Sequence, residues 1–131
     1  EIDETSPGFF FKQGAARVIG VDQCFSDIHF YGENLSGIWI HERLKENYQI
    51  RSLLASHSPT LLKVDIEGDE VLLFDLDEED LSSVSKMAIE YHSETLEQGV
   101  LKWSEGLGFN IRENHRFTYG KGAKGVLYLD R

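Results

Sequence analysis

The stretch Thr60–Leu76, "TLLKVDIEGDEVLLFDL", decides the fold of this chain. Its first part, Leu61–Asp65, is a mostly apolar run that ends in a carboxylate, and this pattern predicts a buried strand. Three more acidic residues, Glu67, Asp69 and Glu70, follow directly. Apolar strands without strict alternation are typical of parallel sheets, so the stretch favours an α/β fold with acidic groups at the end of a core strand.

The segments on either side alternate between strand and helix patterns. Upstream, Ala16–Asp22 ("ARVIGVD") and Asp27–Gly32 ("DIHFYG") predict strands, and "GENLSG" predicts a loop after the second. Downstream, "KMAIEYH" predicts a strand, and Ser93 is a good N-cap for the helix in "SETLEQGVLKWSEGLGF". We therefore expect a mostly parallel sheet with helices on both faces. The strands in "FNIREN" and "GVLYLDR" predict an antiparallel C-terminal hairpin at one sheet edge.

Length and composition limit the partners of the chain. Its 131 residues predict a single domain over 1–131. The net charge is −10 and the 13 basic residues form no block, so we expect no nucleic-acid partner. No apolar run reaches the roughly 18 residues of a membrane helix. The single cysteine, Cys24, fits a reducing compartment, and we expect a cytoplasmic protein that binds a small molecule and can form a homo-oligomer.

Acidic side chains stand at the ends of three predicted strands: Asp22, Asp65, and Glu90 with His92 close behind. Ligands of open parallel sheets bind outside the carboxyl ends of the strands. We therefore expect these groups to converge on one edge of the sheet and to line a site. The alternative is that acids after a strand cap the following helix and face its dipole. For Asp65, and likewise for the nearby Glu67, Asp69 and Glu70, both interpretations remain open at this point.

The motif "LLKVDIEGDE" resembles the signature of the FkbM-type methyltransferases, a Rossmann-like branch that uses S-adenosylmethionine. The matching residues are Lys63, Asp65, Glu67, Gly68 and Glu70. "MAIEYH" is similar to the family's next strand, which ends in an acid, and "LGFNI" is similar to its later Gly-Phe and strand. "GAARVIGVD" and "HFYGENLSG" resemble the second and third strands of the family.

The resemblance implies S-adenosylmethionine as cofactor and O-methylation of a small hydroxyl-bearing acceptor such as a sugar or secondary metabolite, and this hypothesis assigns no residue to a metal ion. It places Asp22 on the ribose hydroxyls and Asp65 on the methionine amino group or the acceptor. The adenine contacts then fall on Asn34, Leu35 and Ser36, and Gly8 stands in the place of the family's glycine loop. The candidate catalytic residues are His92 and Glu67 as bases, with Glu90 beside them; an imidazole titrates near neutral pH.

Two departures from the family pattern concern the N-terminal side. The family opens with a strand and a D-x-G-x-x-x-G loop, whereas this chain has only "EIDETSPGFF". Four residues separate Asp22 from Asp27, where the family has a whole helix. We therefore expect the N-terminal side to be compressed or incomplete.

Two rival functions remain open from the sequence. The first is a divalent-metal-dependent hydrolase in which Asp65, Glu67, Glu90 and His92 hold Mg²⁺ or Mn²⁺, because hard cations prefer oxygen ligands. The second is a non-catalytic methyltransferase-like remnant or binding module, which the reduced glycine loop supports.

Overall fold

A computed structural model describes residues 13–22, 30–32, 35–117 and 122–131. The chain divides into two compact units, residues 1–43 and residues 44–131. Each unit is described by itself below. The expected single domain over 1–131 stays a prediction.

The described part of the first unit is a three-stranded sheet with the order β1-β3-β2. Its strands are β1 (Arg17–Asp22), β2 (Phe30–Gly32) and β3 (Leu35–His41). β1 and β3 are parallel, and β2 and β3 are antiparallel. The predicted loop "GENLSG" is therefore wrong for Leu35 and Ser36, which belong to β3. The reason is pairing on both sides, since Ser36 lies opposite Tyr31 of β2 and Arg17 of β1.

The second unit is built on a four-stranded sheet with the order β4-β5-β7-β6 in its described residues. The strands are β4 (Leu61–Val64), β5 (Lys86–Tyr91), β6 (Asn110–Phe117) and β7 (Lys124–Asp130). β4 and β5 are parallel, whereas β7 is antiparallel to both β5 and β6. The fold is α/β as expected, and the C-terminal hairpin at the sheet edge is confirmed. The expected mostly parallel sheet is wrong here, because the hairpin makes this sheet mixed.

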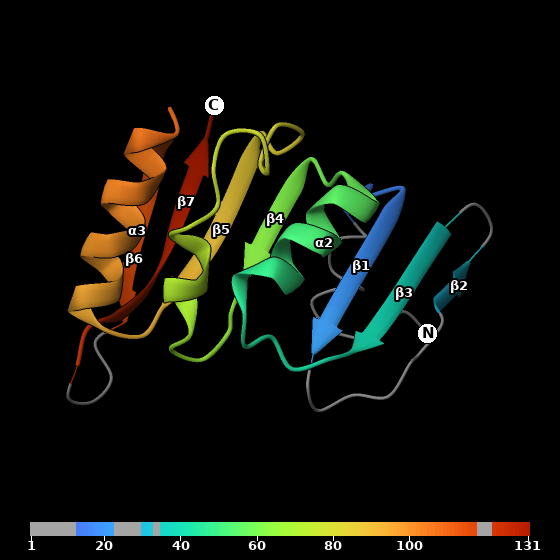
Figure 1. Cartoon of the computed structure of the whole chain (residues 1–131), viewed down its shortest axis with the longest axis horizontal. Coiled ribbons are helices and arrows are strands. Elements are labelled where there is room, and N and C mark those ends of the chain that lie inside the picture. The colour runs from blue at the N-terminus through green and yellow to red at the C-terminus, as the bar shows by residue number, and fades with distance from the viewer. Residues whose placement is uncertain (1–12, 23–29, 33–34, 118–121) are drawn as a thin grey trace. The chain divides into compact units, whose positions relative to one another are not determined.

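The helical segments of this unit are α2 (Asn47–His57), the 3-10 turn η1 (Glu70–Leu73) and α3 (Glu94–Gly106). All three lie on the same face of the four-stranded sheet (Figure 1). Helices on both faces are therefore not found among the described residues of this unit. The N-cap of α3 is confirmed, since the Ser93 hydroxyl accepts a hydrogen bond of 3.1 Å from the Leu96 amide.

The core lies between the sheet and these helices. Along β5 and β7, alternate side chains are buried, and the register places Met87 opposite Leu129 and Ile89 opposite Leu127. Trp103 of α3 closes the core, and its indole N–H donates to the carbonyl of Leu76 at 3.0 Å. The parallel strands β4 and β5 both contribute side chains to this core.

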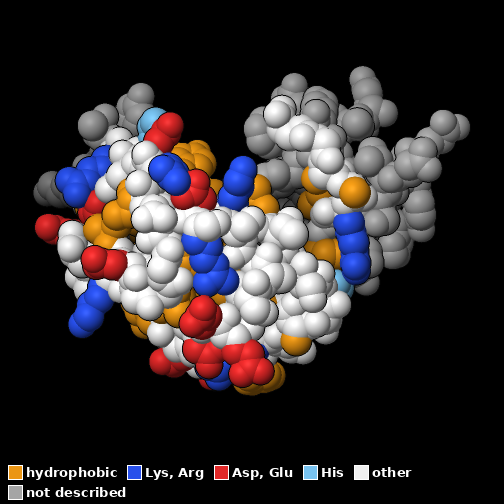
Figure 2. Space-filling model, turned by 90° about the horizontal axis from the view of Figure 1, so that it is seen from above, with side chains coloured by type: hydrophobic (Ala, Val, Ile, Leu, Met, Phe, Trp, Pro, Cys, Tyr) orange, Lys and Arg blue, Asp and Glu red, His pale blue; other side chains and the backbone are white. Residues whose placement is uncertain are grey.

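None of the helices in the described ranges is long and apolar enough to cross a membrane. Figure 2 views the second unit from above Figure 1, where the amino ends of β4 and β5 lie. Lysine and arginine side chains are scattered between acidic ones on this face rather than gathered in a patch. The distribution gives no support to a phosphate-binding surface on this face.

A buried charge ties α3 to the edge strand β6. Glu97 is 1% exposed, and its Oε1 atom accepts hydrogen bonds from Asn114 at 2.8 Å and from Arg116 at 2.7 Å. Burial opposes ionisation of Glu97, but these hydrogen bonds outweigh it and lower the pKa of the carboxyl below its ordinary value. Tyr91 joins the same network, because its hydroxyl donates to Asn114 at 3.0 Å.

The folded pKa of Glu97 lies below the unfolded one, so the unfolded chain takes up a proton first on acidification. The stabilisation by Glu97 is therefore complete above pH 4.5, its ordinary pKa, and is lost as pH falls through the lowered value.

Arg116→Met is expected to lower the free energy of unfolding by about 1–3 kcal/mol at pH 7, because the buried Glu97 loses charged hydrogen bonds. The matched control is Arg112→Met, on the same strand and with the same 64% exposure, whose partner Asp130 is more exposed. It is expected to cost less than about 1 kcal/mol. Urea unfolding at pH 7 and at acid pH measures both variants. Equal losses of unfolding free energy in the two variants would contradict the role given to Glu97. So would a loss for Arg116→Met that is as large at acid pH as at pH 7.

Candidate functional site

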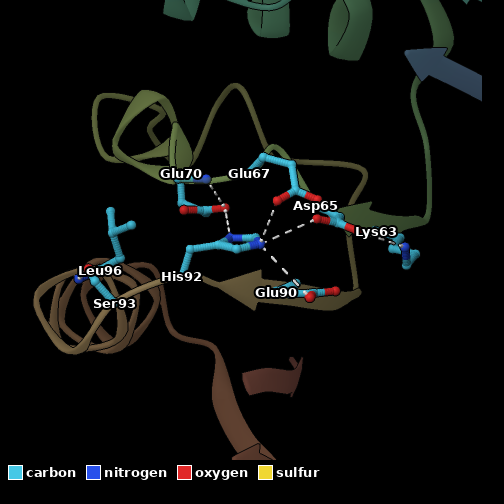
Figure 3. A network of polar contacts seen from close by, with 9 residues as sticks. Lys63, Asp65, Glu67, Glu70, Glu90, His92, Ser93 and Leu96 are labelled. Atoms are coloured by element: carbon cyan, nitrogen blue, oxygen red, sulfur yellow. Dashed lines mark hydrogen bonds and ion pairs between the residues drawn. The ribbon is translucent and has the colours of Figure 1, made fainter. Parts of the chain in front are cut away.

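The turn after β4 brings three acidic side chains to one place. Glu67 and Gly68 have positive backbone φ angles of 54° and 104°, so the chain reverses sharply there. A left-handed conformation costs a non-glycine residue roughly 1–3 kcal/mol, and such strain is often found at functional sites. Because of this reversal, Glu70 at the start of η1 comes back toward the end of β4, on the same side as Asp65 and Glu67 (Figure 3).

The neighbouring strand β5 supplies the other half of the site. β4 and β5 run parallel with Val64 opposite Ile89, so both strands end at the same edge of the sheet. Tyr91 is fully buried and anchors the end of β5. Glu90 and His92 are the residues before and after Tyr91 in the sequence, and His92 directly precedes Ser93, the N-cap of α3. Packing of Tyr91 therefore positions the functional groups next to it.

His92 lies at the centre of the cluster, and Glu70 fixes its ring. The Nδ1 atom of His92 is 2.7 Å from Oε1 of Glu70, and the same oxygen accepts a bond of 3.2 Å from the Gly68 amide. Glu70 is completely buried. Where Glu70 is ionised it can only accept a hydrogen bond, and the neutral ring that fits this contact then carries its proton on Nδ1 and presents a lone pair at Nε2.

The second oxygen of Glu70, Oε2, has no hydrogen-bond partner among the described residues. A buried carboxylate with an unsatisfied oxygen costs stability, and an apolar residue would avoid this cost. The buried carboxyl is therefore explained by its contacts with His92 and the Gly68 amide rather than by apolar packing.

Three further carboxylates face the other ring nitrogen, Nε2 (Figure 3). The distances from Nε2 are 3.4 Å to Oε2 of Glu67, 3.8 Å to Oδ1 of Asp65 and 3.9 Å to Oε1 of Glu90. The His92 side chain is 9% exposed, whereas Glu67 is 75% exposed. The cluster is therefore open to solvent on the Glu67 side and closed around Nδ1.

The cluster holds more negative than positive charge. Burial raises the pKa of the Glu90 carboxyl above its ordinary value, and the charge of Asp65 raises it further, while His92 and Lys63 act in the opposite direction. Lys63 contributes one ammonium group, with Nζ 3.9 Å from Oδ2 of Asp65. A site of this kind favours a cation or a proton at its centre.

The structure brings together four of the residues singled out from the sequence: Asp65, Glu67, Glu90 and His92. Their catalytic and binding roles stay predictions. Asp22 ends β1, and Leu35 and Ser36 begin β3, so all three belong to the first unit. Their convergence with the cluster also stays a prediction. Gly8 and Asn34 lie outside the described residues.

Sequence reasoning missed the role of Glu70. It is part of the matched motif, and both lining a site and capping a helix stayed open for it, but no contact with His92 was predicted. The available signal was the position of Glu70 three residues after Glu67 across a glycine, because a sharp turn at Gly68 returns the chain to the strand end. A contact 22 positions away, with His92, cannot be read from local spacing.

Comparison with known proteins adds no relative. No protein-family model matches the chain, no curated protein matches it, and no solved structure matches it. The geometry of the cluster and the residues of the motif therefore carry the functional argument.

Proposed function

We propose that this chain is part of an S-adenosylmethionine-dependent methyltransferase of the FkbM type that methylates an oxygen of a small hydroxyl compound. The observation that carries the proposal is the meeting of two sequence motifs at one imidazole. "KVDIEGDE" ends β4 and "IEYH" ends β5, and the two strands are parallel neighbours. Carboxylates from both motifs surround His92.

The order of the strands supports the same proposal. The last strand, β7, is antiparallel and lies between β5 and β6. A parallel pair β4–β5 with an antiparallel edge hairpin is partly consistent with the Rossmann-like fold that the resemblance implies. Fold alone does not determine function, so the cluster at His92 remains the main support.

Methyl transfer to a hydroxyl is an in-line displacement that also releases a proton. The acceptor oxygen bonds to the methyl carbon, the bond from carbon to sulfur breaks, and S-adenosylhomocysteine leaves. We assign the proton to Nε2 of His92, whose lone pair faces the open side of the cluster. A positioned base contributes about 10²–10⁴-fold. Asp65, Glu67 and Glu90 stabilise the resulting imidazolium, and Glu70 holds the ring in place.

The acidic cluster also suits the cofactor, whose sulfonium and amino groups are cationic. In this proposal Asp65 contacts the methionine amino group or the acceptor, and Asp22 binds the ribose hydroxyls. The resemblance assigns the adenine contacts to Asn34, Leu35 and Ser36 and contact with the methionine part to Gly8. The roles of these residues rest on the resemblance of the motifs.

Asp22→Ala is expected to weaken binding of S-adenosylhomocysteine by about tenfold, or on the order of 1.4 kcal/mol, because a charge-assisted hydrogen bond to the ribose is lost. Isothermal titration calorimetry with S-adenosylhomocysteine measures this effect. The matched control is Glu78→Ala, which removes one exposed negative charge elsewhere and is expected to leave the affinity unchanged.

Unchanged affinity in Asp22→Ala would remove Asp22 from the site. No binding by the unmodified chain at millimolar ligand would favour the non-catalytic remnant instead. A positive titration is followed by transfer of a labelled methyl group to a panel of sugars and other small hydroxyl compounds.

A metal-dependent hydrolase is the second candidate, because Asp65, Glu90 and His92 bring three ligand atoms within 4.8 Å of one another. Hydrolytic activity that is lost on chelation and needs no S-adenosylmethionine would favour it over the methyltransferase.

A further inference from the structure

We propose that Asp65, Glu90 and His92 form a binding site for a divalent transition-metal ion of the Mn²⁺ class. Each residue offers one ligand atom, and these atoms lie within 4.8 Å of one another. Asp65 follows β4, Glu90 belongs to β5, and His92 precedes α3, so the ligands are attached to regular elements of the second unit.

The state of His92 is the observation that points to a ligand. Its Nδ1 atom is engaged by the buried Glu70, and its side chain is 9% exposed. Its Nε2 atom makes no hydrogen bond within the described ranges, although it points at three carboxylates (Figure 3). A nearly buried ring nitrogen that faces three carboxylates without a hydrogen bond marks a position where a cation would be stabilised. Metal-bound histidines commonly donate their other ring N–H to a carboxylate, and Glu70 lies in the corresponding place, 2.7 Å from Nδ1 of His92.

Two of the spacings between the ligand atoms fit one ion, and the third, between the oxygens of Asp65 and Glu90, is at most 4.8 Å. A metal with bonds of about 2.1 Å holds adjacent ligand atoms about 3.0 Å apart and opposite ones about 4.2 Å apart. Nε2 of His92 lies 3.8 Å from Oδ1 of Asp65 and 3.9 Å from Oε1 of Glu90, between these limits. Small rotations of the two carboxylates are therefore enough to coordinate an ion.

The charge of the surroundings favours a dication. Four carboxylates lie within 3.9 Å of the His92 ring, and in the described part of the chain Lys63 is the basic side chain paired with one of them, Asp65. The carboxylates of Asp65, Glu67 and Glu90 converge on one ring nitrogen and repel one another. A metal ion removes this repulsion.

The donor set selects the kind of ion. Carboxylates suit Mg²⁺, Ca²⁺ and Mn²⁺, whereas imidazole suits transition metals and zinc. One imidazole with two carboxylates therefore favours Mn²⁺ over Mg²⁺. The solvent-exposed side near Glu67 leaves room for water or an oxygen of a substrate.

This metal site does not rest on the proposed methyltransferase function. Nε2 of His92 can hold a proton or a metal ion, but not both. In a metal-bound enzyme, the ion rather than His92 would therefore lower the pKa of an acceptor hydroxyl.

The test is titration of MnCl₂ into metal-stripped protein, followed by calorimetry and by the electron paramagnetic resonance signal of free Mn²⁺. Asp65→Asn and His92→Ala are each expected to weaken Mn²⁺ binding at least tenfold, about 1.4 kcal/mol. The matched control is His115→Ala, because His115 also contacts a carboxylate, Glu113, but both are exposed on β6. It is expected to bind Mn²⁺ as the unmodified chain does.

Paramagnetic broadening of amide signals locates the ion without any variant, and we expect it at Gly68 and Glu90. Several outcomes would overturn the proposal: no binding up to about 1 mM Mn²⁺, unchanged affinity in Asp65→Asn, broadening centred on β6, or tighter binding of Mg²⁺ than of Mn²⁺. Titration with S-adenosylhomocysteine is a separate measurement. The absence of S-adenosylhomocysteine binding would therefore contradict the methyltransferase proposal without affecting the measured affinity for Mn²⁺.

Discussion

Glu70→Gln is expected to weaken Mn²⁺ binding by about 10–100-fold while the chain stays folded, because groups that orient a metal-bound histidine have effects of this size. A glutamine has nearly the shape of Glu70 and can occupy the same buried position. Its amide can present either an oxygen or an N–H group to Nδ1 of His92. The N–H orientation moves the ring proton to Nε2 and removes the lone pair that faces Asp65, Glu67 and Glu90.

Long-range proton–nitrogen NMR spectra of His92 report the position of the ring proton directly. In the unmodified chain we expect the proton on Nδ1, and in Glu70→Gln we expect a population with the proton on Nε2. Asp69→Asn is the matched control, since it makes the same chemical change at the adjacent, exposed position. A tautomer and a Mn²⁺ affinity that are unaffected by Glu70→Gln would show that Glu70 has only a structural role.

Gly125→Ala is expected to destabilise the second unit by about 3 kcal/mol, the upper part of the range for overpacking. Gly125 is buried in β7, opposite Tyr91 of β5 and Arg116 of β6. A methyl group at this position would overlap the Tyr91 hydroxyl and the backbone carbonyl of His115. That carbonyl belongs to a paired strand, so it cannot move away without breaking hydrogen bonds between β6 and β7.

Thermal unfolding should show a fall in Tm on the order of 10 °C for this variant. The control is Gly106→Ala, at the end of α3, where an added methyl group meets no atom within 4 Å. It should stabilise the chain by up to about 1 kcal/mol, because glycine is a poor helix former. Tyr91 directly precedes His92, so Gly125→Ala should also weaken Mn²⁺ binding. Unchanged Tm would mean that β5 and β7 adapt to the added volume.

The sequence predicted the elements around the site well, because each has a strong local signal. The apolar run before Asp65 and the apolar residues before His92 are strands. Ser93 caps α3 as predicted, and Gly108 follows its end with a positive φ of 77°. The meeting of Asp65, Glu67, Glu90 and His92 followed from one rule, that parallel strands deliver their carboxyl ends to the same edge.

The parts that failed depend on contacts between distant segments. Leu35 and Ser36 look like loop residues, but pairing with β1 and β2 makes them a strand. Glu97 has the position of an acid in the first turn of α3, yet it is buried because Asn114 and Arg116 reach it from β6. The placement of all described helices on one sheet face likewise depends on connections that apolar patterning does not encode.

The edge strand β6 has a consequence for the behaviour of the protein at high concentration. Every residue of this strand is exposed, and it carries Arg112, Glu113, His115 and Arg116 in close succession. An open strand edge can recruit a second chain by backbone pairing, and closely spaced charges oppose this because they would be brought together and desolvated. The charges of β6 therefore oppose pairing of this edge with a second chain, whereas the exposed apolar side chains of Ile111 and Phe117 on the same strand favour it.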